Sequence, residues 1–135
     1  MRRRALLLLL CAANLATAAA RPDHCSVRDF GAKGDGHTDD TAAFQKALDK
    51  MGRAGGGVVY APRGNYFFAG HLTVPVAVTL KGVWESVPAH VGLRNPGWNK
   101  PTDDGTTFLV TENRGREDGP PFITLNADAT LKGVV

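Results

Sequence analysis

The sequence predicts an all-β fold in which short strands stack as successive coils of a solenoid, with one helix covering the first coil. Three observations support this prediction. A single stripe of apolar residues at helical spacing lies between residues 43 and 51. From residue 57 onward, short β-rich runs alternate with turn signals. Two runs nearly repeat, Val-Thr-Leu-Lys-Gly-Val at 78–83 and Ala-Thr-Leu-Lys-Gly-Val at 129–134, as expected of coils that bury aliphatic side chains on one another.

The first twenty residues have the parts of a secretory signal peptide in the required order. Arginines at positions 2–4 form a positive region, an apolar run follows as far as residue 13, and small residues suited to cleavage lie at 16–20. The apolar run is too short and wrongly flanked for a transmembrane helix. We therefore expect residues 1–20 to be removed and the protein to be secreted, either outside the cell or into a periplasm.

The positive net charge of the chain comes from the signal peptide. The formal net charge is +3, and the three arginines at 2–4 account for all of it. Residues 21–135 are formally neutral and contain no run of lysine and arginine. The charge is therefore no evidence for binding to nucleic acid or to an anionic membrane, and we expect neither as a partner.

Cys25 is the only cysteine that remains after the signal is removed. In a secreted protein, a single thiol indicates either a disulfide partner elsewhere or a buried free thiol. The position of Cys25 near the start of the domain gives little support to a metal-binding or nucleophilic role.

The first elements expected after a short lead-in are a strand at 27–30 and a glycine-rich turn. The turn contains three glycines, for which positive φ costs little: Gly31, Gly34 and Gly36. A helix is expected from about Asp40 to Met51, capped by Thr38 or Asp39.

One face of this helix should be buried and the other should face water. The apolar stripe consists of Ala43, Phe44, Ala47, Leu48 and Met51. Gln45 and Lys46 fall outside it and are expected in water. Gly52 is the expected C-cap, and the glycines at 55–57 end any helical tendency.

The strands expected after the helix are short. They lie at 58–60, 66–68, 71–74, 76–80, 108–110, 122–125 and 130–134, with a turn at 62–65. The polar, proline-rich piece at 85–107 fits neither strand nor helix. A long insert of this kind is expected to form a loop on one side of the solenoid.

The segment from Val27 to Leu48, Val-Arg-Asp-Phe-Gly-Ala-Lys-Gly-Asp-Gly-His-Thr-Asp-Asp-Thr-Ala-Ala-Phe-Gln-Lys-Ala-Leu, resembles the opening segment of the pectate-lyase-like superfamily. That superfamily includes rhamnogalacturonase, polygalacturonase and epimerase-like proteins. The resemblance implies a right-handed parallel β-helix with an N-terminal cap helix. It covers residues 26–83 well and the later runs loosely. It also implies that residues 21–135 are the N-terminal part of the domain, truncated here, with further coils after residue 135.

The resemblance implies a polysaccharide partner, a uronan or another plant or microbial glycan. The function it implies is that of a secreted pectin- or uronan-degrading glycoside hydrolase or polysaccharide lyase. In the superfamily the catalytic acids lie on the lateral face of later coils, so no catalytic residue is expected here. The alternative is a non-catalytic β-helical module, such as an adhesin, a tail-fibre-like protein or a glycan-binding domain. Whether the parent protein is an enzyme therefore stays open.

Three carboxylates cluster in the opening turn, at Asp35, Asp39 and Asp40. Paired acids serve glycoside hydrolysis, and clustered acids also bind calcium. A glycine-rich turn followed by Thr-Asp-Asp at a helix start is, however, ordinary capping, and we favour this structural interpretation. No residue spacing indicates a metal site, and no cofactor is expected.

Four residues around the proline-rich piece are candidates for binding a glycan: Trp84, Glu85, Trp98 and Lys100. Exposed indoles stack on sugar rings, and a lysine binds a uronate carboxylate. The alternative is that both tryptophans fasten the loop to the surface of the coil, which is the commoner role of aromatic side chains. Asp103 and Asp104, in the same piece, fit a turn better than a catalytic pair.

Overall fold

The computed structural model describes residues 22–85 and 105–135. In chain order the elements are β1 (His24–Ser26), the 3-10 helix η1 (Val27–Phe30), β2 (Asp35–Asp39), α1 (Thr41–Arg53), β3 (Gly57–Tyr60), β4 (Gly64–Phe68), β5 (Leu72–Val74), β6 (Val78–Lys81), β7 (Thr106–Val110), β8 (Ile123–Leu125) and β9 (Thr130–Lys132). From β3 onward, each strand pairs with the strand three places later, because one coil of the solenoid contributes one strand to each side.

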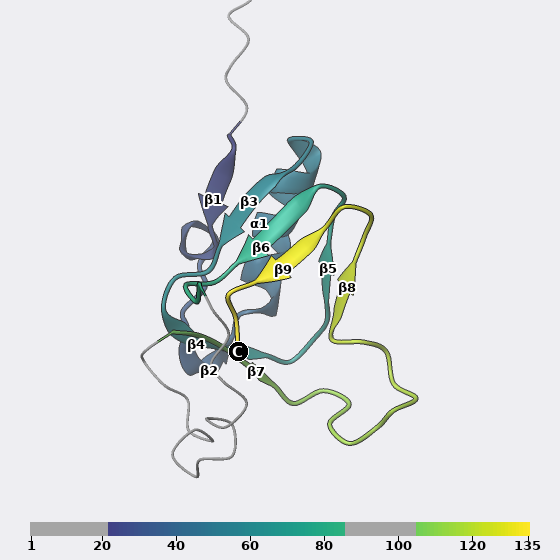
Figure 1. The fold of residues 1–135 in the computed structure, drawn as a ribbon. Helices are drawn as coiled ribbons and strands as arrows, with labels where there is room; N and C mark the ends of the chain where they lie inside the picture. Colours follow the sequence, from purple (N-terminus) through teal and green to yellow (C-terminus); the bar gives the residue numbers. More distant parts are fainter. Residues whose placement is uncertain (1–21, 86–104) are drawn as a thin grey trace, which may run out of the picture.

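The strands form three parallel sheets, which are the sides of the solenoid (Figure 1). Sheet A contains β1, β3, β6 and β9, sheet B contains β2, β4 and β7, and sheet C contains β5 and β8. Every pairing between neighbouring strands is parallel. The all-β parallel solenoid predicted from the sequence is thus confirmed.

The two near-repeats of the sequence lie directly on one another. Within sheet A, Thr79 is opposite Thr130, Leu80 is opposite Leu131 and Lys81 is opposite Lys132. Leu80 is fully buried and Leu131 packs against the same core. The repeat therefore marks equivalent positions in two successive coils.

A column of aromatic rings runs through the core and joins the cap helix to the coils. Phe44 of α1 lies 4.9 Å from Phe68, measured between ring centroids, and Phe68 lies 4.9 Å from Phe108 and 5.0 Å from Phe122. The contacts with Phe44 and Phe108 are edge-to-face, the geometry that aromatic pairs prefer. Helix α1 is thus held by the same side chains that hold the coils together.

The buried face of α1 is the predicted one. Phe44, Ala47, Leu48 and Met51 are fully buried, and α1 covers the first coil of the solenoid (Figure 1). Cys25 lies beneath the helix, with its Sγ 3.9 Å from the carbonyl oxygen of Ala47. It is a buried free thiol in the described part of the chain, and burial raises its pKa.

Gln45 was predicted to lie in water, and its side chain is only partly exposed. Its side-chain amide pairs with the backbone of Thr73 in β5: Nε2 donates to the carbonyl oxygen at 3.1 Å, and Oε1 accepts from the N–H at 2.9 Å. In the part of the chain that the structure describes, sheet C has no strand on this side of β5. Gln45 takes the place of that strand, because unpaired backbone groups at a sheet edge require partners.

The predicted strand at 27–30 is wrong, since these residues form η1. The cause is local capping. The Ser26 side chain accepts the N–H of Arg28, the Asp29 carboxylate accepts the N–H of Ser26, and Gly31 ends the turn with φ at 95°. This reciprocal arrangement is a capping box. The strand of this coil is β1, just before it.

The predicted helix ends are shifted as well. The N-cap is Asp40, because Thr38 and Asp39 belong to β2. Gly52 is not the C-cap, since α1 continues to Arg53. A Cβ at Gly52 would lie 2.7 Å from the Cβ of Pro75, so a glycine is needed there for close packing. The polar strand β2 was not expected, and the turn expected at 62–65 is shorter because β4 begins at Gly64.

Candidate functional site

The three carboxylates of the opening turn are bound by the turn itself. Asp35 accepts the N–H groups of His37 and Thr38 at 2.9 and 2.8 Å and the Thr38 hydroxyl at 2.7 Å. Asp40 is 1% exposed and accepts the N–H groups of Lys33 and Gly34 at 2.6 and 3.0 Å.

Asp39 is occupied in the same way. It accepts the N–H of Thr41 at 3.0 Å and that of Ala69 at 3.2 Å. All three acids therefore hold backbone in place, which agrees with the structural interpretation. Within residues 22–85 and 105–135, no group of three or more His, Cys, Asp and Glu side chains could hold a metal ion. The expectation that the protein uses no metal or cofactor stays a prediction.

The role of Asp35 gives a pH dependence of stability. The N–H groups of Thr38 and His37, together with the Thr38 hydroxyl, lower the pKa of Asp35 from 3.8 to about 2. A folded-state pKa below the unfolded one adds stability that is complete above the unfolded value and disappears as the pH falls toward 2. Asp35→Asn should therefore destabilise the protein at pH 6, and the difference from wild type should shrink between pH 5 and pH 2. Urea denaturation across this range measures it, and a difference independent of pH would contradict this role of Asp35.

The segment that connects sheet A to sheet B differs in length from one coil to the next. In the first complete coil, residues 61–63 join β3 to β4, whereas in the next coil residues 82–105 join β6 to β7. The two corners are tied together by Thr106, which is fully buried. Its hydroxyl donates to the carbonyl of Ala61 at 2.8 Å and accepts the N–H of Val83 at 3.1 Å. The described residues on either side of the predicted insert, Val83 and Thr106, are therefore held together next to sheet A.

Trp84 and Glu85 lie where this insert begins. The Trp84 indole covers Gly105, since a Cβ at that glycine would lie 2.1 Å from the ring. The backbone N–H of Trp84 donates to the carbonyl oxygen of Gly133 at 3.1 Å. The indole Nε1 is buried and has no hydrogen-bond partner among residues 22–85 and 105–135. This packing favours fastening of the insert over stacking on a sugar. Trp98 and Lys100 lie outside the described residues, as do Asp103 and Asp104, so their predicted roles stay predictions.

Glu85 points back to sheet A. Its carboxylate lies 3.3 Å from the Nζ of Lys81, and the two side chains are 81% and 31% exposed. Lys81 belongs to a line of side chains that crosses sheet A from coil to coil: Ser26, Tyr60, Lys81 and Lys132 are successive partners in the register. We call this line the outer row. The flanking residues Val59 and Leu80 are fully buried, so alternation along each strand places the outer row outside.

The outer row has no complete signal in the sequence. The near-repeat indicates that Lys81 and Lys132 are equivalent, because they occupy the same place in its two copies. Tyr60 is in neither copy, and only the register aligns it with the lysines.

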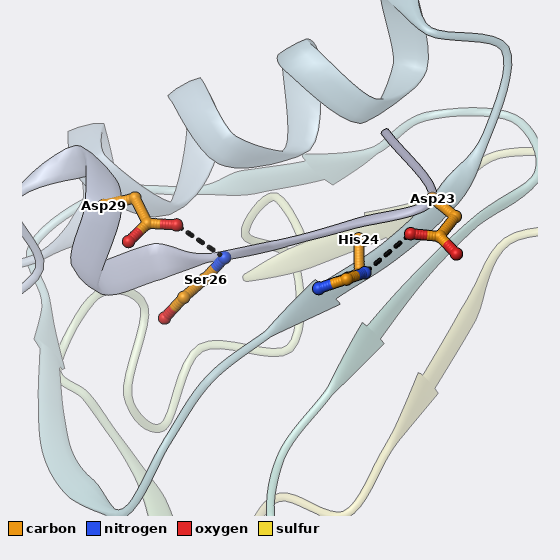
Figure 2. A network of polar contacts seen from close by, with 4 residues as sticks. All are labelled: Asp23, His24, Ser26 and Asp29. Atoms are coloured by element: carbon orange, nitrogen blue, oxygen red, sulfur yellow. Dashed lines mark hydrogen bonds and ion pairs between the residues drawn. The ribbon is translucent and has the colours of Figure 1, made fainter. Parts of the chain in front are cut away.

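At the first strand of sheet A, a histidine lies beside a carboxylate. His24 lies beside Asp23, with 2.6 Å between its Nδ1 and the Asp23 Oδ1 (Figure 2). The same view shows the Asp29 carboxylate on the N–H of Ser26 (Figure 2). The two lysines of the outer row lie at its other end, in β6 and β9. The described residues enclose no pocket, and their only helix long enough to consider, α1, is neither long nor apolar enough to cross a bilayer.

Comparison with known proteins decides the family. The sequence model of the family described as rhamnogalacturonase A/epimerase, pectate lyase-like matches residues 24–97, more than half of the chain. The chain belongs to this family. The superfamily inferred from the opening segment is thereby confirmed.

Relatives of this pectate lyase-like chain act on polysaccharides according to their names. Alginate lyase 7 of Azotobacter vinelandii is 60% identical over 45 residues, which are 33% of this chain and 5% of that protein. A probable glucan endo-1,3-beta-glucosidase of Arthroderma benhamiae is 40% identical over 122 residues, 82% of this chain and 14% of that protein.

A solved structure supports the same fold. The A-module of the mannuronan C-5 epimerase AlgE4 from Azotobacter vinelandii superposes with a TM-score of 0.55 and 27% identity, over 83% of this chain and 28% of that one. The likeness confirms the right-handed parallel β-helix implied by the opening segment. In all three comparisons the pectate lyase-like chain spans far less than two thirds of its relative.

Proposed function

We propose that this pectate lyase-like chain belongs to a secreted enzyme that acts on a uronan, a polysaccharide of sugar acids. The observation that carries the proposal is its similarity to uronan-acting relatives: 60% identity to a stretch of an alginate lyase and a shared fold with a mannuronan epimerase module. The lysines of sheet A, the exposed Lys132 and the half-buried Lys81, suit the negative charge of such a polymer. The acids of the opening turn are occupied by backbone groups, so we assign the chemistry to other residues of the protein.

The reaction class is tested with the full protein and three polymers: alginate, polygalacturonate and a β-1,3-glucan. A lyase produces new reducing ends together with an unsaturated product that absorbs in the ultraviolet. A hydrolase produces reducing ends without that absorbance. Turnover of alginate or polygalacturonate is the expected result. Binding without cleavage, and without any change in the sugar composition of the polymer, would contradict the proposal and support a non-catalytic glycan-binding module.

A second candidate is cleavage of a neutral β-1,3-glucan. It is favoured by the extent of the match to the probable glucan endo-1,3-beta-glucosidase, which covers 82% of this chain, whereas the match to the alginate lyase covers 33%. In the same assay, turnover of the β-1,3-glucan without turnover of either uronan would select this candidate.

Export is the part of the proposal that depends on residues 1–20. Arginines at 2–4, the apolar run and the small residues at 16–20 support cleavage by a signal peptidase. N-terminal sequencing of the secreted protein should give a first residue near Ala19 or Arg21. Recovery of protein that still begins at Met1 from the medium or periplasm would contradict it.

A further inference from the structure

We propose that the outer face of sheet A binds an anionic polysaccharide along the solenoid axis, with Tyr60, Lys81 and Lys132 as contact residues and Glu85 as an internal competitor. This inference rests on the proposed function, because it assigns the uronan to a particular surface. Its test is arranged so that the two can fail separately.

The register supplies one side chain of the outer row from each coil. Tyr60 is opposite Lys81 and Lys81 is opposite Lys132, and neighbouring strands of a sheet lie about 4.8 Å apart. The side chains form a line parallel to the axis with a spacing close to the length of one sugar in an extended chain. Because the backbone hydrogen bonds of the sheet hold this spacing, the points from which the two lysine side chains project are fixed before a ligand arrives.

The outward positions of sheet A carry lysines and no acidic side chain, and the carboxylates nearest to them, Asp23 and Glu85, lie outside the strands. The eight outward positions of sheet A form two rows, and the second contains His24, Val58, Thr79 and Thr130. Neither row contains a carboxylate. In sheet C the outward pair is Thr73 with Thr124, and in sheet B Asp35 leads the row that continues with Asn65 and Thr107. Among the outward strand positions of the three sheets, the lysines therefore lie in sheet A, as Lys81 and Lys132.

These groups match the chemistry of a uronan. Each sugar of such a polymer carries a carboxylate, which attracts a lysine ammonium through charge-assisted hydrogen bonds. Tyr60 is 37% exposed, and its ring offers an apolar face with a polar tip to a pyranose ring. A neutral glucan would gain nothing from the lysines, so the surface discriminates by charge.

Glu85 already imitates a bound carboxylate. It lies 3.3 Å from the Nζ of Lys81 but is itself 81% exposed. An exposed ion pair of this kind is worth little, because water and salt screen it. A uronate carboxylate can therefore displace Glu85, and removal of the Glu85 charge should strengthen binding.

The experiment measures binding of the full secreted protein to alginate and to polygalacturonate, with a neutral β-1,3-glucan as comparison. Glu85→Gln should tighten uronan binding about threefold, the upper part of the range for an exposed ion pair. Lys132→Gln should weaken it about threefold, and Lys81→Gln combined with Lys132→Gln about tenfold. Lys132→Arg should retain binding. Lys46→Gln is the matched control, because it removes the same charge from the exposed side of α1.

Raised salt should reduce the difference between wild type and Lys132→Gln, since exposed charges are screened. If Lys81 and Lys132 variants bind uronan like the wild type, the surface is wrongly assigned; the proposed function stands if the enzyme still turns uronan over. Equal losses for uronan and for neutral glucan would overturn recognition by charge. If the protein neither binds nor acts on any of the three polymers, both proposals fail.

Discussion

Phe44→Ala should reduce the free energy of unfolding by about 3–5 kcal/mol, the range for truncation of a buried aromatic side chain. Phe44 is fully buried and its ring contacts Tyr66, Phe68 and Phe108 edge-to-face. Truncation removes the contacts of α1 with two strands of sheet B, β4 and β7, at once. Chemical denaturation of the full chain measures the loss.

Lys46→Ala is the control on the same helix, since Lys46 is exposed and surface substitutions change stability by about 0.5 kcal/mol or less. A loss near zero for Phe44→Ala would show that α1 is not part of the cooperative core. That result would contradict the role of the helix as the cap of the solenoid.

Asp40→Ala should cost about 3 kcal/mol, taking about 1.5 kcal/mol for each of two hydrogen bonds to a charged group. The buried Asp40 carboxylate accepts the N–H groups of Lys33 and Gly34, and alanine leaves both donors without a partner. The opening turn should lose its shape and α1 its fixed starting point. Denaturation by urea, with hydrogen exchange at residues 33 and 34, tests both effects.

Asp40→Asn provides a graded comparison. Its side chain has the same shape and keeps one acceptor oxygen, so the loss should be smaller than for alanine. Equal stability of wild type and Asp40→Ala would mean that the turn is held by other contacts. The match of this segment to the pectate lyase-like family would then need a different physical reason.

Local patterns predicted much of this structure correctly. The apolar stripe of α1 identified the buried residues Phe44, Leu48 and Met51 because the helical period is a property of a short stretch of chain. The near-repeat identified β6 and β9 for the same reason. The strand predicted at residues 27–30 was wrong because side-chain capping of the backbone was overlooked. The capping box of Ser26 and Asp29 makes these residues a 3-10 helix. The polar strand β2 gave no signal because pairing with β4 defines it.

Fewer features of the candidate site than of the fold could be predicted from the sequence. Trp84 and Glu85 were singled out for their chemistry, and the structure gives them concrete contacts, with Gly105 and Lys81 respectively. Tyr60 was not singled out, because a tyrosine at the end of a short strand has no distinguishing local pattern. Its relation to Lys81 depends on the register between β3 and β6.

The sequence by itself determined the fold class, the buried face of the cap helix and the approximate strands of each coil. These features depend on periodicity, turn residues and a repeat, all of which are local. Only the tertiary structure decided which side chains align from coil to coil and that Gln45 pairs with the edge of β5. The physical reason is that alignment depends on how the connecting segments close each coil. Residues 61–63 and residues 82–105 make the same connection, from sheet A to sheet B, in two successive coils. Equivalent positions in successive coils are therefore not separated by a constant number of residues.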